Sequence, residues 1–372
     1  MDKIWIATIG IIVLIPIIAF IIFFSYNASL SPSLSSTNLE KCNSLIYNAQ
    51  AKTSLVFFSS KENAEKYANF FLQTKPFSDN KNNFNFNYID SYNPKCEIYQ
   101  GIATLCYSKE IIKKASSCPN DYIVVLDTQE SKIRSSTYMN VLSLNSASQL
   151  SILTHEFGHA FANLADEYVP AELSSGSKNC VLDCKDFLNK SDGCFQGCSK
   201  TEYFRSIDSG VMRTLSSNNY GLFNEDLISG RIFKSLINPL TGFAVENQEN
   251  LIDCSSQKYY LIEAVYNDGT IEVKDKTIES GCPGSNGYGG FNYSIIKSDG
   301  SIVTENEFNP ELIFTDVQLE EELQGEIIIS GKSFLLKVPI IKDSKELQIS
   351  KDAQILSQIN LQDIGARPCR GG

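Results

Sequence analysis

The chain has 372 residues, of which 42% are apolar and 20% are charged, and its formal net charge is -11. This composition is that of a globular protein and excludes a disordered chain. The acidic balance argues against nucleic acid as a partner, because phosphate binding needs a basic face. The length allows about two domains beside any targeting segment.

An apolar run at the N-terminus predicts a membrane anchor over residues 1–25. Ile4 to Phe24 carries no charge and is long enough to cross a bilayer as a helix. Lys3 is the nearby flanking cation, which favours a cytoplasmic N-terminus with the rest of the chain outside. A cleaved signal peptide is the alternative, although its apolar core would be shorter. We therefore expect an N-terminal transmembrane helix, the membrane as a partner, a single-pass location in the cell membrane, and a tether at residues 26–48.

Strand and helix patterns alternate along residues 49–147. This alternation predicts a mostly parallel sheet, because parallel strands need helical crossovers between them. The last strand before residue 148 would lie at an edge, where an extended peptide could pair with it antiparallel. The predicted strands are 53–59, 83–89, 121–127 and 136–144, and the predicted helices are 62–72 and 110–116.

The next predicted helix carries both histidines of the chain, His155 and His159, and Ser148 is its expected N-cap. Residues four apart lie on one helix face, so both imidazoles can bind one metal, and Glu156 can reach a water there. Two neutral nitrogen ligands, an open position and a carboxylate base form the zincin arrangement. The alternative is a helix with two surface histidines, which requires both histidines of the chain to take this spacing by coincidence.

The residues that follow resemble one zincin family. The string from His155 to Tyr168 reads H-E-F-G-H-A-F-A-N-L-A-D-E-Y and resembles the IgA-cleaving zinc metallopeptidases, which are metzincin-like. Met212, in a V-M-R context, resembles the metzincin Met-turn beneath the metal, with simple core packing as the alternative. The resemblance implies a zinc endopeptidase in which His155 and His159 bind Zn2+ and Glu156 is the catalytic base. It does not imply IgA as the substrate.

We name Asp166 as the third metal ligand. Two histidines and a water leave tetrahedral zinc one ligand short, and the chain has no third histidine. In a continuous helix Asp166 would lie about 10 Å further along the axis than His159. The helix must therefore end near Ala162 or Asn163, and Asn163 can adopt a left-handed conformation, although the family usually has glycines there. The nearest rival is Glu167, and the more distant ones are Glu202 and Glu225.

The cysteines indicate an oxidising location. All eleven lie after residue 40, and the odd count leaves at least one free or paired to another chain. Four of them form two C-x3-C pairs separated by nine residues, namely Cys180, Cys184, Cys194 and Cys198. Structural zinc sites usually have tighter C-x2-C pairs, so we predict two disulfides here, with three pairings possible. If both C-x3-C pairs are helical turns, a nested pairing staples a hairpin, Cys180 with Cys198 and Cys184 with Cys194.

From about residue 258 the apolar pattern has a period of two. Asn-Asp-Gly at 267–269 and Ser-Asp-Gly at 298–300 are hairpin signals between short strands. This spacing predicts an antiparallel sandwich whose role is packing or binding. The predicted strands are 259–266, 270–274, 291–297, 301–304, 326–330, 333–338 and 346–349.

Together these patterns predict an α/β zincin (metzincin-like) catalytic domain with a mostly parallel sheet at residues 49–238, followed by an all-β sandwich-like domain at 250–366. The expected function is that of a membrane-anchored, extracellular zinc-dependent endopeptidase with a polypeptide substrate. The alternative is a non-catalytic adhesion or scaffold protein of the cell surface with a metal-stabilised zincin fold. Glu156 favours the enzyme, because a purely structural site gains little from a base.

Overall fold

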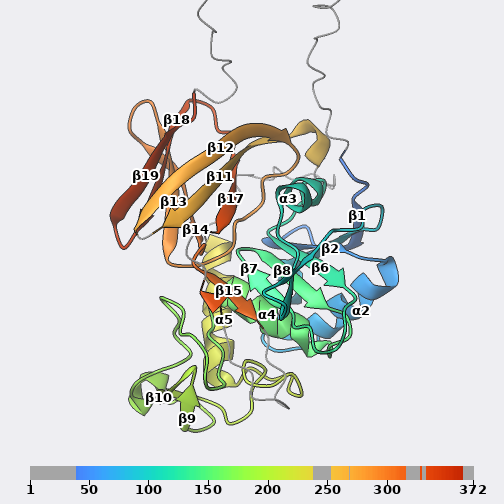
Figure 1. Ribbon diagram of the computed structural model, residues 1–372, viewed down its shortest axis with the longest axis vertical. Helices are drawn as coiled ribbons and strands as arrows, with labels where there is room; N and C mark the ends of the chain where they lie inside the picture. Colours follow the sequence, from blue (N-terminus) through green and yellow to red (C-terminus); the bar gives the residue numbers. More distant parts are fainter. Residues whose placement is uncertain (1–38, 238–252, 268, 316–326, 329–331, 363–372) are drawn as a thin grey trace, which may run out of the picture. The chain divides into compact units, whose positions relative to one another are not determined.

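The computed structural model describes residues 39–237, 253–267, 269–315, 327–328 and 332–362. Its main feature is an eight-stranded sheet in the order β1-β3-β2-β6-β8-β7-β15-β16 (Figure 1). The inner strands β3, β2, β6 and β8 pair in parallel, whereas the outer pairings are antiparallel. The strands are β1 (Asn43–Ile46), β2 (Thr53–Phe58), β3 (Phe84–Ile89), β6 (Tyr122–Asp127), β7 (Ser136–Tyr138), β8 (Val141–Asn145), β15 (Leu312–Thr315) and β16 (Ile327–Ile328).

The predicted fold class, an α/β domain with a mostly parallel sheet, is wrong. The chain has more strand than helix, 36% against 20%, and the large sheet is mixed. One cause lies in residues 136–144, predicted as a single strand. Met139 has a positive φ of 55° and turns the chain, so β7 and β8 form an antiparallel hairpin. The other cause is β15, which comes from the region predicted as an all-β domain and pairs with β7. Residues 136–144 therefore do not form the expected edge strand.

The central strands are buried on both faces, as the apolar run 121–127 predicts. Leu55 and Phe57 of β2 face a core formed with α2, α4 and α5. Val56 and Phe58 face the opposite way, toward α3 and the strands β11 (Lys258–Asn267) and β17 (Ser333–Pro339). Ser60 caps α2 by accepting a hydrogen bond from the backbone of Asn63. The helices are α2 (Lys61–Phe71), α3 (Lys109–Ala115), α4 (Ser151–Ala162) and α5 (Leu222–Ile237).

Two antiparallel sheets from the C-terminal half share a second apolar core. One has the order β12-β11-β17 and the other β14-β13-β18-β19. The predicted hairpins around residues 267–269 and 298–300 are confirmed, because β11 pairs with β12 and β13 with β14. The strands are β11 (Lys258–Asn267), β12 (Thr270–Ser280), β13 (Phe291–Lys297), β14 (Ile302–Phe308), β17 (Ser333–Pro339), β18 (Ser344–Lys351) and β19 (Gln354–Asn360).

Two smaller sheets complete the described chain. One pairs β4 (Glu97–Tyr99) with β5 (Ala103–Leu105), and the other pairs β9 (Phe195–Cys198) with β10 (Lys200–Arg205). Because β9 is a strand, the second C-x3-C pair is not a helical turn, yet the nested pairing forms across this hairpin region.

Five disulfides join ten of the eleven cysteines, and Cys369 lies outside the described residues. They confirm that the four clustered cysteines are linked to one another in the nested pattern. This disulfide content is consistent with an extracellular protein. The pairs are Cys42–Cys118, Cys96–Cys106, Cys180–Cys198, Cys184–Cys194 and Cys254–Cys282.

The predicted membrane anchor is corrected. Within the part of the chain that the structure describes, no helix is both long enough and apolar enough to cross a bilayer. The expected span, Ile4 to Phe24, lies outside the described residues. On this finding we withdraw the transmembrane helix, the membrane as a partner and the single-pass location in the cell membrane.

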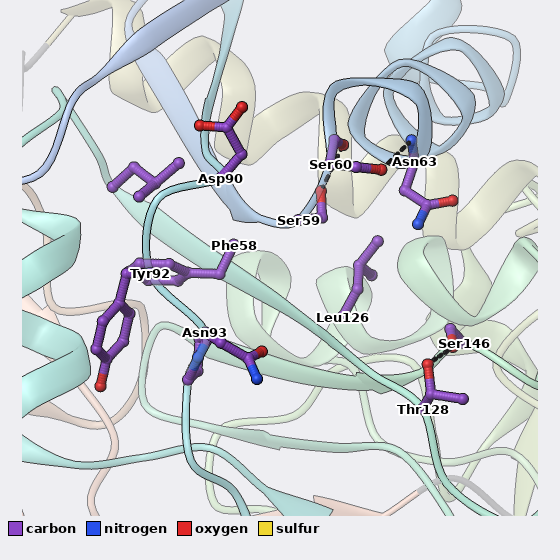
Figure 2. A pocket seen from close by; sticks show the side chains of 12 residues that line it. Phe58, Ser59, Ser60, Asn63, Asp90, Tyr92, Asn93, Leu126, Thr128 and Ser146 are labelled. Carbon is purple, nitrogen blue, oxygen red and sulfur yellow. Dashed lines mark hydrogen bonds between the residues drawn. The ribbon is translucent and has the colours of Figure 1, made fainter.

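A cavity of about 230 Å³ opens at the carboxyl ends of β2, β3 and β6. Figure 2 shows Ser59, Asp90 and Thr128 at its wall, each directly after one of these strands. Ligands of open α/β sheets often bind at such a place. Its lining residues include neither histidine of the chain, so this cavity is separate from the metal group described next.

Candidate metal site

Helix α4 differs from its prediction at the start and agrees with it at the end. The expected cap by Ser148 is wrong, because the helix begins at Ser151 and its N-cap, Leu150, makes no side-chain hydrogen bond. At the other end, Asn163 is left-handed, with φ 50° and ψ 39°. Its side-chain amide donates to the Ser175 carbonyl oxygen at 2.9 Å, which holds the turn in place. The predicted helix break is therefore confirmed.

The turn at Asn163 brings His155, His159 and Asp166 together. The two Nε2 atoms lie 3.1 Å apart, and Asp166 Oδ1 lies 3.2 Å from His155 Nε2 and 3.3 Å from His159 Nε2. Two atoms bound to one tetrahedral zinc at about 2.0–2.1 Å are about 3.3 Å apart. All three residues are at most 1% exposed. This buried group can hold a metal ion.

Hydrogen bonds on the far side of each ring orient the two imidazoles. His155 Nδ1 lies 2.8 Å from the Val211 carbonyl oxygen, and His159 Nδ1 lies 2.6 Å from that of Leu164. Since a carbonyl oxygen only accepts, each Nδ1 carries the proton and each Nε2 presents a lone pair. Metal-binding histidines have this arrangement, in which an outer partner fixes the tautomer.

The charge of the group also suits a cation. Burial lowers the pKa of His159 below its ordinary value, which favours the neutral ring. Among the described residues, Asp166 Oδ1 has no hydrogen-bond donor. Three buried acceptor atoms in mutual contact are unfavourable unless a cation lies among them.

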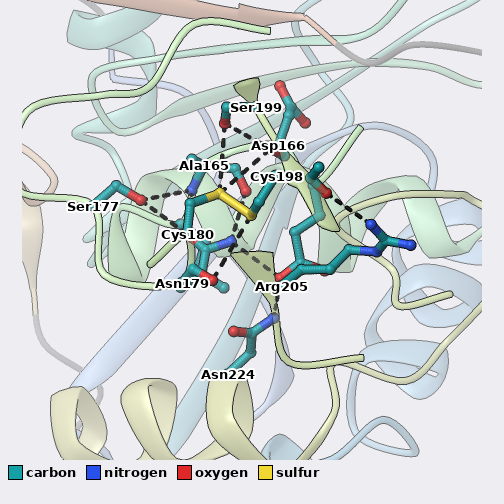
Figure 3. Close-up of a disulfide and its surroundings, with 12 residues drawn as sticks. Ala165, Asp166, Ser177, Asn179, Cys180, Cys198, Ser199, Arg205 and Asn224 are labelled. Atoms are coloured by element: carbon teal, nitrogen blue, oxygen red, sulfur yellow. Dashed lines mark hydrogen bonds between the residues drawn. A yellow bond between two sulfur atoms is a disulfide. The ribbon is translucent and has the colours of Figure 1, made fainter. Parts of the chain in front are cut away.

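Residues 179–198, which two disulfides close and which we call the cysteine hairpin, support the loop that carries Asp166 (Figure 3). The Ala165 backbone N–H donates to Asn179 Oδ1 at 2.8 Å, and the Asn179 amide donates back to the Ala165 oxygen at 2.8 Å. The disulfide between Cys180 and Cys198 packs against Ala165. The hairpin therefore fixes the return of the chain toward the metal group.

Glu167, the nearest rival ligand, points away from the group. Its Oε1 accepts hydrogen bonds from Asn224 at 2.7 Å and Asn179 at 3.2 Å. Burial raises the pKa of Glu167 to about 7, although both amides act to lower it. Its backbone N–H donates to the Met212 oxygen at 2.8 Å. The other two candidate ligands, Glu202 and Glu225, also lie outside the group.

Met212 is buried in the main apolar core against α4, which both the Met-turn interpretation and simple core packing expect. A Cβ on Gly158 would lie 2.8 Å from Met212 Sδ, so the glycine of H-E-F-G-H leaves room for this sulfur. Val211, the preceding residue, accepts the hydrogen bond from His155. The turn at 211–212 thus supports the helix and orients one of its histidines.

Glu156 is held by the strand beside it. Its Oε2 accepts a hydrogen bond from Thr137 Oγ1 at 2.6 Å, and its side chain is buried. This contact places the Glu156 carboxylate on the side of α4 that faces β7. As a buried carboxylate directly after a candidate metal ligand, Glu156 is the candidate base for a metal-bound water.

Strand β15 covers the group from the other side. The Phe314 ring stacks on His159, with centroids 4.1 Å apart and planes at 13°. The Tyr168 hydroxyl lies 2.9 Å from Asp166 Oδ2 and 3.1 Å from the Thr315 carbonyl oxygen. The metal group is therefore enclosed by residues far apart in the sequence.

Several supporting residues were not found from the sequence. Tyr168 ends the recognised string and could have been named from it. The others contact the site only through the fold, and no local pattern marks them. They are Thr137, Asn179, Ser199 and Phe314.

The comparisons with known proteins give no family for this chain. No protein-family model matches it, and no curated protein matches it. The resemblance to the IgA-cleaving metallopeptidases therefore rests on the residues from His155 to Tyr168 and on Met212.

Proposed function

We propose that the protein is a zinc-dependent endopeptidase of the metzincin type, similar to the IgA-cleaving metallopeptidases. The observation that carries this proposal is the convergence of three buried acceptor atoms from His155, His159 and Asp166. Glu156 follows His155 directly in the chain and is also buried. The donor set of two imidazoles and one carboxylate suits zinc and leaves one tetrahedral position open. Catalytic zinc sites keep such a position, whereas structural sites close it with a fourth protein ligand.

The roles of the side chains follow from their contacts. A bound zinc ion would supply Lewis acidity, which makes water a nucleophile near neutral pH and polarises a carbonyl group. Glu156 takes the proton from the attacking water and delivers it to the amine of the broken peptide bond. Thr137 fixes the carboxylate orientation for both transfers, since its hydroxyl donates to Glu156 Oε2 at 2.6 Å.

One observation favours the alternative, a non-catalytic scaffold with a metal-stabilised fold. The group is almost fully buried, as structural metal sites are. However, such a site has no use for a carboxylate placed as Glu156 is. We therefore rank the enzyme first.

The test is metal content and peptide hydrolysis in the same sample. The full chain is depleted of metal, reloaded with zinc and incubated with a mixed peptide library, with Glu156→Gln as the matched control. We expect one zinc in both proteins, cleavage of internal peptide bonds by the wild type, and a loss of about 10²–10⁴-fold in the variant. Equal rates in the two proteins would remove Glu156 as the base.

A further inference from the structure

Strand β15 lies where an extended substrate is expected. It pairs antiparallel with the outer edge of β7, with Ile313 opposite Tyr138, Phe314 opposite Thr137, and Thr315 opposite Ser136. Thr137 is the residue that holds Glu156. A polypeptide that adds to a free sheet edge uses the same backbone hydrogen bonds. The chain therefore fills its own peptide-binding edge.

The contacts of β15 reach the metal group itself. The Phe314 ring stacks on His159, and the Thr315 carbonyl oxygen lies 3.1 Å from the Tyr168 hydroxyl, which also contacts Asp166. Ile313 and Thr315 are fully buried, and Phe314 is 4% exposed. A second polypeptide cannot occupy this edge while β15 is there.

We propose that β15 is a built-in pseudosubstrate that keeps the site closed until it leaves β7. This inference rests on the proposed endopeptidase function, because it assigns the edge of β7 to the substrate. A closed form that must open lowers the apparent activity by the fraction of molecules that are open. The wild type is therefore a latent enzyme, whose rate rises when the β7–β15 pairing weakens.

The pseudosubstrate also defines the class of substrate. A polypeptide that replaces β15 in the same register places one side chain opposite Thr137, in the space that Phe314 fills. The wall of that space includes the face of His159, which favours an aromatic ring over a small or charged side chain. The substrate is thus an extended segment with an aromatic residue at this position.

Few residue pairs join β15 to its neighbouring strands. Three residue pairs join it to β7, and two join it to β16 on its other side. Phe314 contributes the ring contact with His159, so its removal weakens the closed form without changing a metal ligand. We therefore choose Phe314 as the position to test.

The experiment compares zinc-loaded full-length proteins on one fluorogenic peptide that contains a phenylalanine. The variants are Phe314→Ala and, as a matched control, Phe187→Ala, which removes another buried ring that packs on Phe223. We expect Phe314→Ala to be roughly tenfold or more faster than the wild type, because a buried Phe→Ala change removes substantial contact energy. We expect Phe187→Ala to match the wild type and all proteins to bind one zinc. Should Phe314→Ala fail to fold, Phe314→Leu keeps most of the volume without the ring, and its rate should also exceed the wild-type rate.

A peptide added in trans provides an independent measurement. The synthetic peptide N-P-E-L-I-F-T, which has the sequence of residues 309–315, should inhibit the Phe314→Ala protein. The same peptide with alanine in place of phenylalanine should inhibit it less.

The outcomes separate this inference from the proposed function. A wild type that cleaves as fast as Phe314→Ala, with no inhibition by the peptide, overturns the pseudosubstrate and leaves the endopeptidase in place. Zinc-loaded wild type, Phe314→Ala and Phe314→Leu that all fail to cleave overturn the endopeptidase itself, and the pseudosubstrate with it.

Discussion

The segment that holds the metal group and the strand that covers it come from different parts of the chain. Ser151 to Asp166 is one continuous stretch, in which α4, the left-handed Asn163 and a short return bring three acceptor atoms together. The covering strand β15 is remote, since Thr315 lies 147 residues beyond Tyr168, and it is brought to the group by strand pairing. Local spacing determines which atoms can bind a metal, and non-local pairing determines whether a substrate can reach them.

We expect the largest effect when a metal ligand in the segment from Ser151 to Asp166 is removed. Asp166→Ala removes one of three ligand atoms, and we expect zinc affinity to fall by more than about 100-fold, beyond the 10–100-fold typical of outer partners. Glu167→Ala is the matched control, because this neighbouring carboxylate contacts Asn224 and Asn179 instead. Titration with a competing chelator measures both. The reverse order would transfer the ligand role to Glu167.

The second prediction concerns the support of that segment. The double substitution Cys180→Ser with Cys198→Ser should lower the free energy of unfolding by about 2–4 kcal/mol and weaken zinc binding. The matched pair Cys184→Ser with Cys194→Ser cuts the outer disulfide, and we expect zinc affinity to stay near that of the wild type. Denaturant unfolding and chelator titration give the two readouts. A larger loss of zinc affinity from the outer pair would contradict the role of the inner disulfide.

A smaller effect is expected where the two regions meet, at Thr137. Thr137→Val keeps the side-chain shape but removes the hydroxyl that orients Glu156. In the Phe314→Ala background, we expect kcat/KM to fall about tenfold, as for one lost hydrogen bond to a charged group. Zinc content should stay the same. Thr154→Val is the control, since that buried hydroxyl donates to the Ser151 carbonyl oxygen. Equal losses from the two variants would reduce Thr137 to a packing role.

The last prediction concerns Lys337, which helps to hold strand β17 against the large sheet. Lys337 of β17 is buried, and its Nζ donates to Asn120 Oδ1 at 2.6 Å. Burial lowers the pKa of Lys337 to about 7, although Asp121 nearby acts to raise it. Between this value and the ordinary 10.5, the unfolded state binds the extra proton, so the lysine makes stability rise with pH. Lys337→Met should remove this rise, on the order of 1–3 kcal/mol between pH 7 and pH 9.5. Parallel stability curves for the two proteins over this range would refute the assignment.

The features that the sequence predicts well are formed by residues that lie close together in the chain. The left-handed Asn163, the return of Asp166 to the histidines and the nested disulfides all depend on residues within a short span. The helix break and the third ligand were named outright from the sequence. The nested pairing was one of three possible pairings and was tied to two helical turns, the second of which is strand β9 in the structure.

What it predicts poorly depends on partners that lie far along the chain. No strand was predicted at residues 312–315, and nothing local in this segment names β7 as its partner, so the sequence could not place β15 beside β7. The turn at Met139 likewise has no glycine or proline to mark it. These two features convert the expected parallel sheet with a free edge into a mixed sheet with a covered one.

The most direct test of the account is the activity of two zinc-loaded proteins that differ only at Glu156. Phe314→Ala and the double variant Phe314→Ala with Glu156→Gln are compared on the same phenylalanine-containing peptide. We predict that both bind one zinc, that the first cleaves the peptide internally, and that the second is about 10²–10⁴-fold slower. Equal cleavage by both, or none by either while zinc is fully bound, would contradict the proposed enzyme.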